Sequence, residues 1–356
     1  MRFHRLTTLN AYVGVAAFAS LCATVQPAAA TAASGNTAMS VVDHWKLGGS
    51  GGWDYLTLDS SGEKLFVSRG TRVDVVSTKT GKIIGSIPDT DGVHGIALAE
   101  DLRRGYTSNG KADSVTAFDL DTLKPILTMK IPGHNPDAIV YDAAGKHIFT
   151  FNGKSKDVTV LAASSLQVLA TLPVPDKPEF AVADGSGHIF VNIESESGQM
   201  VVIDSRKLSV QATWPLPGCA SPSGLALDDR NHRLFSVCDD NTMAVTNAQT
   251  GKQVTRATIG EGPDAAAFDA KRSLVFSSNG EGTLSVIRQT SPDQYQSQGA
   301  VVTQKGARTM ALDPATGVIY LATAALGPTP AATPEQPHPR PSPLADSFTI
   351  LVVRPR

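Results

Sequence analysis

The stretch WDYLTLDSSGEKLFVSRGTRVDVVSTKTGKIIGSIP, residues Trp53–Pro88, decides the fold. It contains four short runs rich in Val, Ile, Leu and Phe, and each run is bounded by Gly, Asp, Ser or Thr. Runs of this length and composition, separated by turn-forming residues, predict four antiparallel strands joined by tight turns.

The same unit recurs along the rest of the chain. The position that ends its first run, called the marker here, is occupied by Asp59, Ala99, Asp142, Asp184, Asp228, Asp269 and Asp313. Successive markers are 40 to 44 residues apart, and an aromatic residue follows each marker by six or seven positions. Seven four-stranded copies of this length predict an all-β fold, a seven-bladed β-propeller with one sheet per blade around a central channel. A solenoid fits less well, because no helical periodicity of useful length appears after residue 35.

The last copy has only three strands, over Met310–Asp313, Val318–Thr323 and Phe348–Val353. A further strand, Val41–Leu47, precedes the first complete copy and has no partner in it. We therefore expect the N-terminal strand to be the outermost strand of the seventh blade, which closes the ring and leaves no open end.

The N-terminus resembles a secretory signal peptide. Arg2 and Arg5 give a basic start, Leu9–Leu21 is largely apolar, and Ala28–Ala30 offers a small-residue cleavage site. The apolar part is too short to span a membrane. We expect residues 1–30 to be a cleaved signal peptide, residues 31–40 to be a disordered linker, and the protein to be periplasmic or secreted.

Composition limits the partners. The signal segment contains two of the 31 basic residues and none of the 33 acidic ones, so the mature chain has a net charge of −4. There is no basic stripe, which argues against nucleic acid as a partner. Residues 41–356 are expected to form a single propeller domain, because repeat architectures exceed the usual length of one domain. We expect a monomer without a membrane span.

Two cysteines remain after the signal segment. Cys219 precedes the first strand of the fifth copy and Cys238 follows its second strand, so both lie at one end of a hairpin. In an oxidising compartment we expect a structural disulfide between them. A free pair or a thiolate metal site is the alternative.

One large insertion, Ala324–Asp346, interrupts the seventh copy between its second and third strands. It is rich in proline, which lacks a backbone N–H donor, so it cannot form ladder strands. In an up-and-down blade this connection emerges on the face where each first strand begins. A lid over that face and a tolerated surface insertion are the two interpretations.

A ring of polar residues is predicted at the channel mouth. Five residues before each marker stand Asp54, His94, Asp137, Glu179, Ser223, Asp264 and Arg308. Because the offset is constant, repeat equivalence places these side chains at one level around one mouth. The ligand-binding residues we predict are Asp54, His94, Asp137, Glu179, Asp264 and Arg308.

Three interpretations of this ring stay open. Polar residues in a solvated channel can simply satisfy one another. Carboxylates with a histidine also suit Ca²⁺, Mg²⁺, Mn²⁺ or Zn²⁺, and Asp137 with Glu179 on one side of the wide ring is the expected metal cluster. Thirdly, the ring can bind a ligand without metal, with Arg308 holding a carboxylate or phosphate.

Other candidates carry less information. Asn109, Asn152 and Asn279 follow second strands and are predicted to be turn residues with left-handed backbone. Of the tryptophans, Trp53 alone is expected near the mouth, while Trp45 and Trp214 are expected to pack against blades. The sequence contains no G-x-S-x-G elbow, P-loop, dinucleotide fingerprint, H-E-x-x-H or C-x-x-C-H motif.

The repeats resemble those of a known family. The runs Leu65–Ser68, Ile189–Asn192 and Val275–Asn279, with the Thr-Gly-Lys turns at 80–82 and 250–252, resemble the YVTN-type repeats of the YncE-like family. The later segments Gly218–Asp228 and Gly306–Pro314 are similar to it as well. The family consists of exported bacterial seven-bladed propellers. The resemblance covers the mature chain and implies a periplasmic or secreted binding or scaffold role. It supplies no catalytic residues that can be transferred to this sequence.

Two functional hypotheses follow. The favoured one is a non-enzymatic binding or scaffold protein that uses one channel mouth for a small ligand, a metal or a partner protein. The alternative is a metal-dependent lactonase or lyase, by analogy of fold with sugar lactonases and the streptogramin lyase. There a divalent ion on the carboxylates polarises a carbonyl, and His94 or Asp264 acts as general base.

Overall fold

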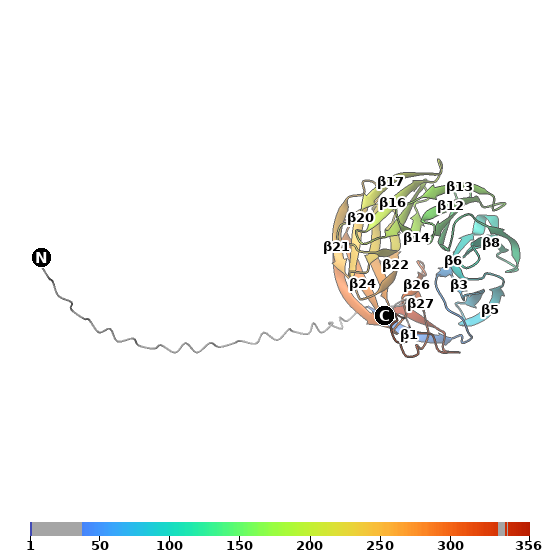
Figure 1. Cartoon of the computed structure of the whole chain (residues 1–356). Helices are drawn as coiled ribbons and strands as arrows, with labels where there is room; N and C mark the ends of the chain where they lie inside the picture. The colour runs from blue at the N-terminus through green and yellow to red at the C-terminus, as the bar shows by residue number, and fades with distance from the viewer. Residues whose placement is uncertain (2–37, 334–338, 340) are drawn as a thin grey trace. The chain divides into compact units, whose positions relative to one another are not determined.

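The computed structural model describes residue 1 and residues 38–333, 339 and 341–356. The described residues from 38 onward belong to one compact unit. Seven four-stranded antiparallel sheets are arranged in a ring (Figure 1), so the predicted all-β seven-bladed propeller is confirmed. The predicted signal peptide and residues 31–37 of the predicted linker lie outside the described part of the chain, apart from Met1.

The first four blades each contain four consecutive strands, ordered from the channel outward. Blade one is β2 (Leu56–Leu58), β3 (Lys64–Ser68), β4 (Val73–Ser77) and β5 (Lys82–Ile87); blade two is β6 (Val93–Ala99), β7 (Arg104–Asn109), β8 (Ser114–Asp119) and β9 (Pro125–Lys130); blade three is β10 (Pro136–Asp142), β11 (His147–Asn152), β12 (Asp157–Ala162) and β13 (Val168–Pro173); blade four is β14 (Lys177–Ala183), β15 (His188–Glu194), β16 (Gln199–Asp204) and β17 (Ser209–Pro215). One 3₁₀ turn, η1 (Glu100–Leu102), joins β6 to β7.

Blades five and six repeat this order and blade seven modifies it. Blade five is β18 (Pro222–Asp228), β19 (Arg233–Cys238), β20 (Thr242–Asn247) and β21 (Gln253–Thr258); blade six is β22 (Pro263–Asp269), β23 (Leu274–Asn279), β24 (Thr283–Ser291) and β25 (Gln294–Val302); blade seven is β26 (Thr309–Leu312), β27 (Ile319–Thr323), β28 (Thr349–Pro355) and β1 (Met39–Lys46).

Blade seven closes the ring with the N-terminal strand, as predicted. Strand β1 pairs with β28 in antiparallel register, from Met39 opposite Pro355 to Lys46 opposite Thr349. The expected strand boundary was wrong, because Met39 and Ser40 belong to β1 and not to a linker. The buried Met39 side chain packs in the core between blades six and seven, which explains the earlier start.

The marker aspartate is explained by the turn that follows it. The Oδ1 atom of Asp59 accepts hydrogen bonds from the backbone N–H groups of Glu63 (2.9 Å) and Lys64 (3.0 Å). Asp184 and Asp269 accept backbone N–H bonds in the same way. Side-chain acceptors of this kind stabilise tight turns. Blade two lacks the acceptor, and there η1 replaces the turn.

The core is divided among the blade interfaces. One cluster joins blades six and seven through Phe276, Leu284, Ile319 and Leu351, all with almost no exposed area. Inner and middle strands are buried, whereas β9 is exposed along its whole length. Stability therefore comes from each blade packing on its neighbours, as in other repeat proteins.

Two tryptophans pack against glycine turns of the outer strands, as expected. A Cβ atom at Gly81, in the first Thr-Gly-Lys turn, would lie 2.6 Å from the ring of Trp45. Gly251, in the equivalent turn of blade five, faces Trp214 in the same way. Both glycines have positive φ, which only glycine adopts without strain.

The asparagine prediction was wrong. Asn109, Asn152 and Asn279 are the last residues of second strands, and their side chains are buried. Each amide donates to a hydroxyl of the third strand, for example from Asn109 Nδ2 to Thr116 Oγ1 at 2.9 Å. These residues therefore satisfy the interior of their own blades and do not form the mouth.

The disulfide between Cys219 and Cys238 is present. The sequence had suggested that Cys238 follows the second strand of blade five, but Cys238 is the last residue of that strand, β19. The bridge ties the loop before β18 to the end of β19 beside Ser221 and Asp239, both of which line the channel mouth.

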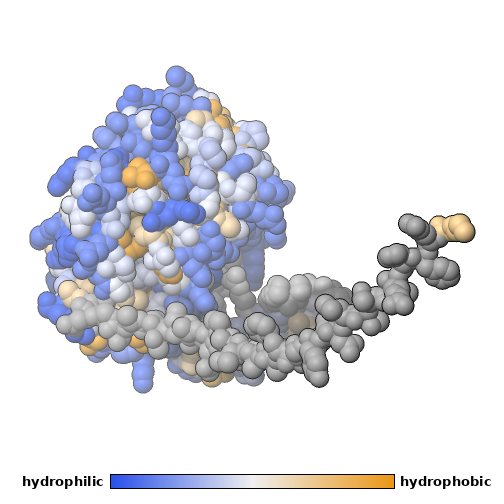
Figure 2. Space-filling view, turned by 90° about the vertical axis from the view of Figure 1, so that its left-hand side faces the viewer, coloured by the Kyte–Doolittle hydropathy of each residue, from blue (hydrophilic) through white to orange (hydrophobic). Residues whose placement is uncertain are grey.

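The surface face drawn in Figure 2 is mostly hydrophilic, with separate small hydrophobic spots. Exposed apolar side chains include Ile84 on β5, Ile126 on β9 and Leu169 on β13. No helix among the described residues is long and apolar enough to cross a membrane. The described surface surrounds a hollow at the centre of the propeller, which the innermost strands line.

Candidate functional site at the channel mouth

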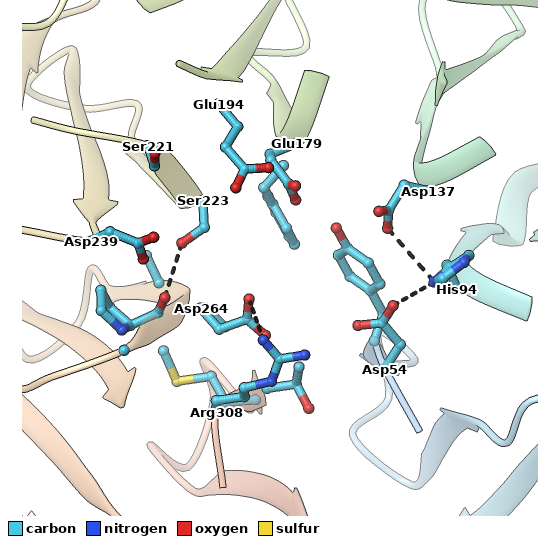
Figure 3. A pocket seen from close by; sticks show the side chains of 18 of the residues that line it. Asp54, His94, Asp137, Glu179, Glu194, Ser221, Ser223, Asp239, Asp264 and Arg308 are labelled. Carbon is cyan, nitrogen blue, oxygen red and sulfur yellow. Dashed lines mark hydrogen bonds and ion pairs between the residues drawn. The ribbon is translucent and has the colours of Figure 1, made fainter. Parts of the chain in front are cut away.

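All seven members of the predicted polar ring line one cavity of about 600 Å³ at the centre of the propeller. Figure 3 shows Asp54, His94 and Asp137 on one side of this cavity, with Asp264 and Arg308 across from them. Each ring residue stands at the entrance of an innermost strand. The constant offset from the marker therefore correctly predicted that these side chains line the same cavity.

Polar side chains of second strands hold the ring residues in place. Asn192 donates from Nδ2 to the carbonyl oxygen of Ser223 (2.9 Å), one blade further on. Ser108 binds the carbonyl oxygen of Asp137, and Ser278 that of Arg308, in the same way. Neighbouring blades thus fix the backbone from which the ring side chains project, and the site is rigid through interblade contacts.

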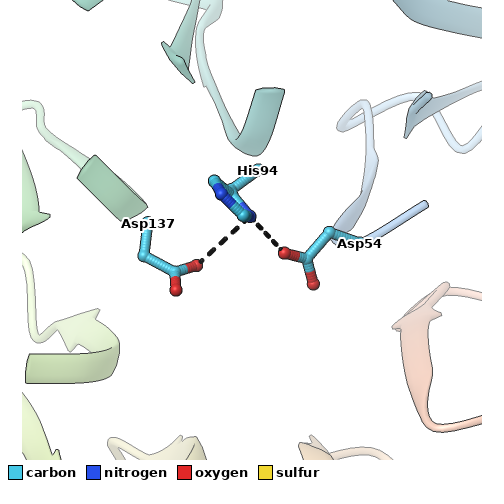
Figure 4. Close-up of side chains that lie close together, drawn as sticks. All are labelled: Asp54, His94 and Asp137. Carbon is cyan, nitrogen blue, oxygen red and sulfur yellow. Dashed lines mark hydrogen bonds and ion pairs between the residues drawn. The ribbon is translucent and has the colours of Figure 1, made fainter. Parts of the chain in front are cut away.

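The first cluster in the cavity contains Asp54, His94 and Asp137. His94 Nδ1 lies 2.6 Å from Asp54 Oδ2 and 3.9 Å from Asp137 Oδ1, as Figure 4 shows. One atom from each of the three residues lies within 4.8 Å of the others, which is a spacing that one metal ion can bridge. The cluster is drawn from three consecutive blades.

Gly110, on the side of the His94 ring away from the carboxylates, limits the orientation of that ring. A Cβ atom at Gly110 would lie 2.6 Å from His94 Nε2, so the glycine leaves just enough room for the imidazole. Nδ1 is consequently the nitrogen that meets the two carboxylates. Although burial opposes it, the hydrogen bond with Asp54 and the negative charge of Asp137 raise the pKa of His94.

Asp137 is the most deeply placed carboxylate of this cluster, with 14% of its side chain exposed. Burial, reinforced by the negative charge of Asp54, raises the pKa of Asp137 to about 6. A carboxyl that titrates near 6 exchanges protons close to neutral pH, which suits either acid–base chemistry or ligand-linked ionisation.

A second cluster combines Lys177, Glu179 and Glu194. Lys177 Nζ lies 2.5 Å from Glu194 Oε2 and also forms an ion pair with Glu179 Oε1. Burial, the hydrogen bond with Glu194 and the charge of Asp137 raise the pKa of Glu179 to about 9. The predicted metal pair of Asp137 and Glu179 is therefore divided, since Asp137 groups with His94 whereas Glu179 groups with Lys177.

The third cluster is the pair of Asp264 and Arg308 from blades six and seven. Arg308 Nη1 lies 3.5 Å from Asp264 Oδ1, and 39% of the arginine side chain is exposed. The negative charge of Asp264 raises the pKa of the Arg308 guanidinium. The pair stands opposite the His94 cluster in the view of Figure 3.

Two aromatic rings cross the channel beneath the polar ring. Tyr55 follows Asp54 and Phe180 follows Glu179, and their ring centroids lie 5.4 Å apart in a stacked arrangement. Blades one and four therefore meet across the channel, and Tyr55 packs on the core of blades three and four. Burial and the charges of four carboxylates raise the pKa of the Tyr55 hydroxyl well above its ordinary value.

The cavity is rich in negative charge. Among the described lining residues, six carboxyl groups face two permanent cations and one histidine: Asp54, Asp137, Glu179, Glu194, Asp239 and Asp264 against Lys177, Arg308 and His94. Burial is the larger cause of the raised pKa of Asp137, and the negative charge of neighbouring carboxylates contributes to the raised pKa of both Asp137 and His94. A cation that enters the cavity replaces protons in balancing these charges.

A second hollow adjoins the cavity. This side pocket, of about 390 Å³, shares Gly262, Arg308 and Thr309 with the main cavity, and its other lining residues include Trp53 and Leu326. Trp53 thus lies at the mouth, as predicted. The proline-rich insertion contributes Leu326, Pro341 and Pro343, so its described part lies on the face of the polar ring.

Several of these residues were not identified from the sequence. The aromatic pair Tyr55 and Phe180 occupies the position directly after the ring, where the other five copies have Gly, Ala or Thr. An alignment of the seven repeats would have revealed this contrast in size and indicated two aromatic side chains in the channel. Lys177 and Glu194, by contrast, stand outside the repeat offset, and only the folded backbone brings them to the cavity.

Comparison with known proteins supports the fold. Similar solved structures include the hydrazine synthase of Kuenenia stuttgartiensis, with TM-score 0.67, 16% identity, and coverage of 76% of this chain and 92% of that chain. They also include U3-55K, with TM-score 0.70, 10% identity, and coverage of 88% of this chain and 98% of that chain. The WD40 repeats of RRP9 have TM-score 0.71 and 11% identity, and the match covers 89% of this chain and 97% of that chain. At such identities the likeness shows the fold alone. No protein-family model and no curated protein sequence matches the chain.

Proposed function

We propose that this protein is an exported propeller of the YncE-like type that binds a small organic cation in its channel mouth. Propellers commonly serve as scaffolds or binding modules. The observation that carries the proposal is the excess of carboxyl groups around a cavity of about 600 Å³. A small organic cation has room to enter this cavity, and its charge is opposite to that of the carboxylates in the cavity wall.

The aromatic floor makes an organic ammonium the best match. Tyr55 and Phe180 present π-systems below the carboxylates, and such surfaces attract ammonium groups and pack against their carbon atoms. The carboxylates of Asp54 and Asp137 provide charge-assisted hydrogen-bond acceptors for the N–H donors. A ligand held between floor and ring buries both its charged and its apolar parts.

Export is supported by separate features. The basic, apolar and small-residue segments at the N-terminus have the order of a signal peptide. The Cys219–Cys238 disulfide is the kind of bond that persists in oxidising compartments. The resemblance to YVTN-type repeats points to the same location.

The experiment is calorimetric titration of the mature protein with isoamylamine, isovaleric acid and isoamyl alcohol. These probes have similar carbon skeletons and different charges. We expect the amine to bind and the acid and alcohol to bind at least tenfold more weakly, and an Asp54→Asn/Asp137→Asn double variant to lose that preference. Equal binding of the three probes, or none, would overturn the proposal.

A second candidate, a metal-dependent lactonase or lyase, is favoured by the position of His94 between Asp54 and Asp137. These three residues would hold a divalent ion, which would polarise a carbonyl when bound. Asp264, across the cavity, would accept a proton from the attacking water or the substrate. Mg²⁺, Ca²⁺, Mn²⁺ and Zn²⁺ titrations of the metal-free protein and of a His94→Ala variant test this candidate. It requires binding that His94→Ala abolishes, followed by metal-dependent turnover of lactones.

A further inference from the structure

The two hollows at the channel mouth differ in character and share three residues, Gly262, Arg308 and Thr309, of which only Arg308 is charged. The main cavity is lined by six carboxyl groups, whereas the side pocket contains no carboxyl group among its described lining residues. Arg308 lines both hollows, and its partner Asp264 lines the main cavity only. A molecule that occupies both spaces therefore passes an acidic wall, then a guanidinium, then an apolar wall.

The side pocket is built for an apolar group. Trp53, Leu326 and two prolines supply its apolar side chains, and four glycines leave the space between them open. Lys305 and Arg308 are the charged residues of its lining. Leu326 lies close to the opposite wall, because a Cβ atom at Gly306 would be in van der Waals contact with Leu326 Cδ1, at 3.5 Å. A concave apolar surface next to a few polar groups is the usual form of a small-molecule site.

The part of the insertion that lines this pocket is anchored at its base. Gly327 N–H donates to Ser342 O (2.8 Å), and Leu344 N–H donates to Ala325 O (2.8 Å), so the two arms of the insertion pair with each other. Gln304 Nε2 donates to Ala324 O at 3.0 Å, which ties the base of the insertion to the loop before blade seven. The wall formed by Leu326 is thus part of the folded structure.

We propose that the ligand is an α-amino acid with a large apolar side chain, a proposal that rests on the channel mouth being a site for organic ammonium groups. The ammonium binds the carboxylate of Asp264 and its acidic neighbours, the α-carboxylate binds Arg308, and the side chain fills the pocket of Trp53 and Leu326. The 3.5 Å spacing of Arg308 and Asp264 places their opposite charges side by side, as the two charges on an α-carbon require.

The ligand series that tests this proposal is L-leucine, leucinamide, N-acetylleucine, glycine and leucyl-leucine, titrated into the mature protein by calorimetry. Leucinamide lacks the carboxylate, N-acetylleucine lacks the ammonium, and glycine lacks the side chain. Leucyl-leucine separates the two charges by a second residue. We expect L-leucine to bind at least tenfold more tightly than each of the others. The first three each lose one of three contacts, and leucyl-leucine cannot place both of its charges on the adjacent Asp264 and Arg308.

Two variants locate the contacts. Arg308→Gln is expected to weaken L-leucine about tenfold and to leave leucinamide unchanged, whereas Arg288→Gln, an exposed arginine of β24, changes neither. Gly52→Leu adds a side chain beside the pocket where a Cβ atom meets nothing within 4 Å. It is expected to weaken L-leucine about tenfold without affecting glycine.

The results separate this proposal from the broader one. If isoamylamine binds and L-leucine does not, the organic-cation site stands and the amino-acid proposal is overturned. Tighter binding of leucinamide or leucyl-leucine than of L-leucine would overturn it too, because the Arg308 contact or the adjacent charges would then be wrong. If neither isoamylamine nor L-leucine binds, both proposals fall.

Discussion

His94 Nδ1 lies 2.6 Å from Asp54 Oδ2 and 3.9 Å from Asp137 Oδ1, so one imidazole faces two carboxylates from the blades on either side of its own. The negative charge of Asp137 raises the pKa of His94, and the charge of His94 in turn opposes the raised pKa of Asp137, so the ionisation of the two residues is linked. Their coupling makes pH the most informative variable for this site.

Asp137→Asn should stabilise the protein at pH 8 by about 1–3 kcal/mol. The pKa of Asp137 is raised from 3.8 to about 6, so the native state retains a proton that the unfolded chain has lost. Stability therefore falls as pH rises between these values and stays lower above them. The difference between the two pKa values corresponds to at most about 3 kcal/mol of lost stability at high pH. The asparagine amide does not ionise, so the variant avoids this loss.

Urea unfolding of both proteins at pH 8 and pH 4 measures this effect, with the exposed Asp240→Asn as a control. The stabilisation should largely disappear at pH 4, where the carboxyl is protonated in the native state. An equal gain at both pH values would show that ionisation of Asp137 is not its cause.

Binding of isoamylamine should become tighter as pH rises from 5 to 7. A cation in the cavity favours the ionised form of Asp137, whose pKa is about 6, and displaces its proton. Calorimetry in buffers of different ionisation enthalpy would detect the released proton directly. In the Asp137→Asn variant the same titrations should lose most of this pH dependence.

Tyr55→Ala should weaken isoamylamine binding and lower stability by about 1–2 kcal/mol. The substitution removes the stacked partner of Phe180 and opens the floor of the cavity. Tyr55→Phe keeps the ring and removes only the hydroxyl, so it should preserve both properties. If Tyr55→Phe is as damaging as Tyr55→Ala, the hydroxyl and not the aromatic floor is responsible.

A Cys219→Ala/Cys238→Ala variant should unfold at lower urea concentration, with a loss of about 3 kcal/mol. The disulfide joins residues 19 positions apart, and the estimate follows from the loop entropy that this bridge removes from the unfolded chain. The wild-type protein treated with reductant provides the comparison. Unchanged stability in both would mean that strand pairing alone holds this corner of blade five.

The fold could be predicted because the information repeats. The marker aspartate binds its own turn, the aromatic after it packs between blades, and each signal appears several times, as at Asp59 and Phe66. The ring residues followed from the same register. What the register predicts, however, is the level of a residue in the channel and not its neighbour on the opposite side.

The groupings within the site therefore required the structure. Glu179 was predicted to join Asp137, but Lys177, two residues earlier on β14, forms an ion pair with it instead. The stack of Tyr55 on Phe180 depends on the width of the channel, which no single repeat encodes. The early start of β1 at Met39 likewise reflects a partner at the far end of the chain.

That distant pairing also sets an order of assembly. Strand β1 is the first described strand to be synthesised, and its partner β28 is the last. The six other blades are therefore synthesised before the partner of β1. Until Thr349–Pro355 is available, both β1 and β27 present an unpaired edge. The ring therefore cannot close before Thr349–Pro355 has been made, and the pairing of β1 with β28 is the step that closes it.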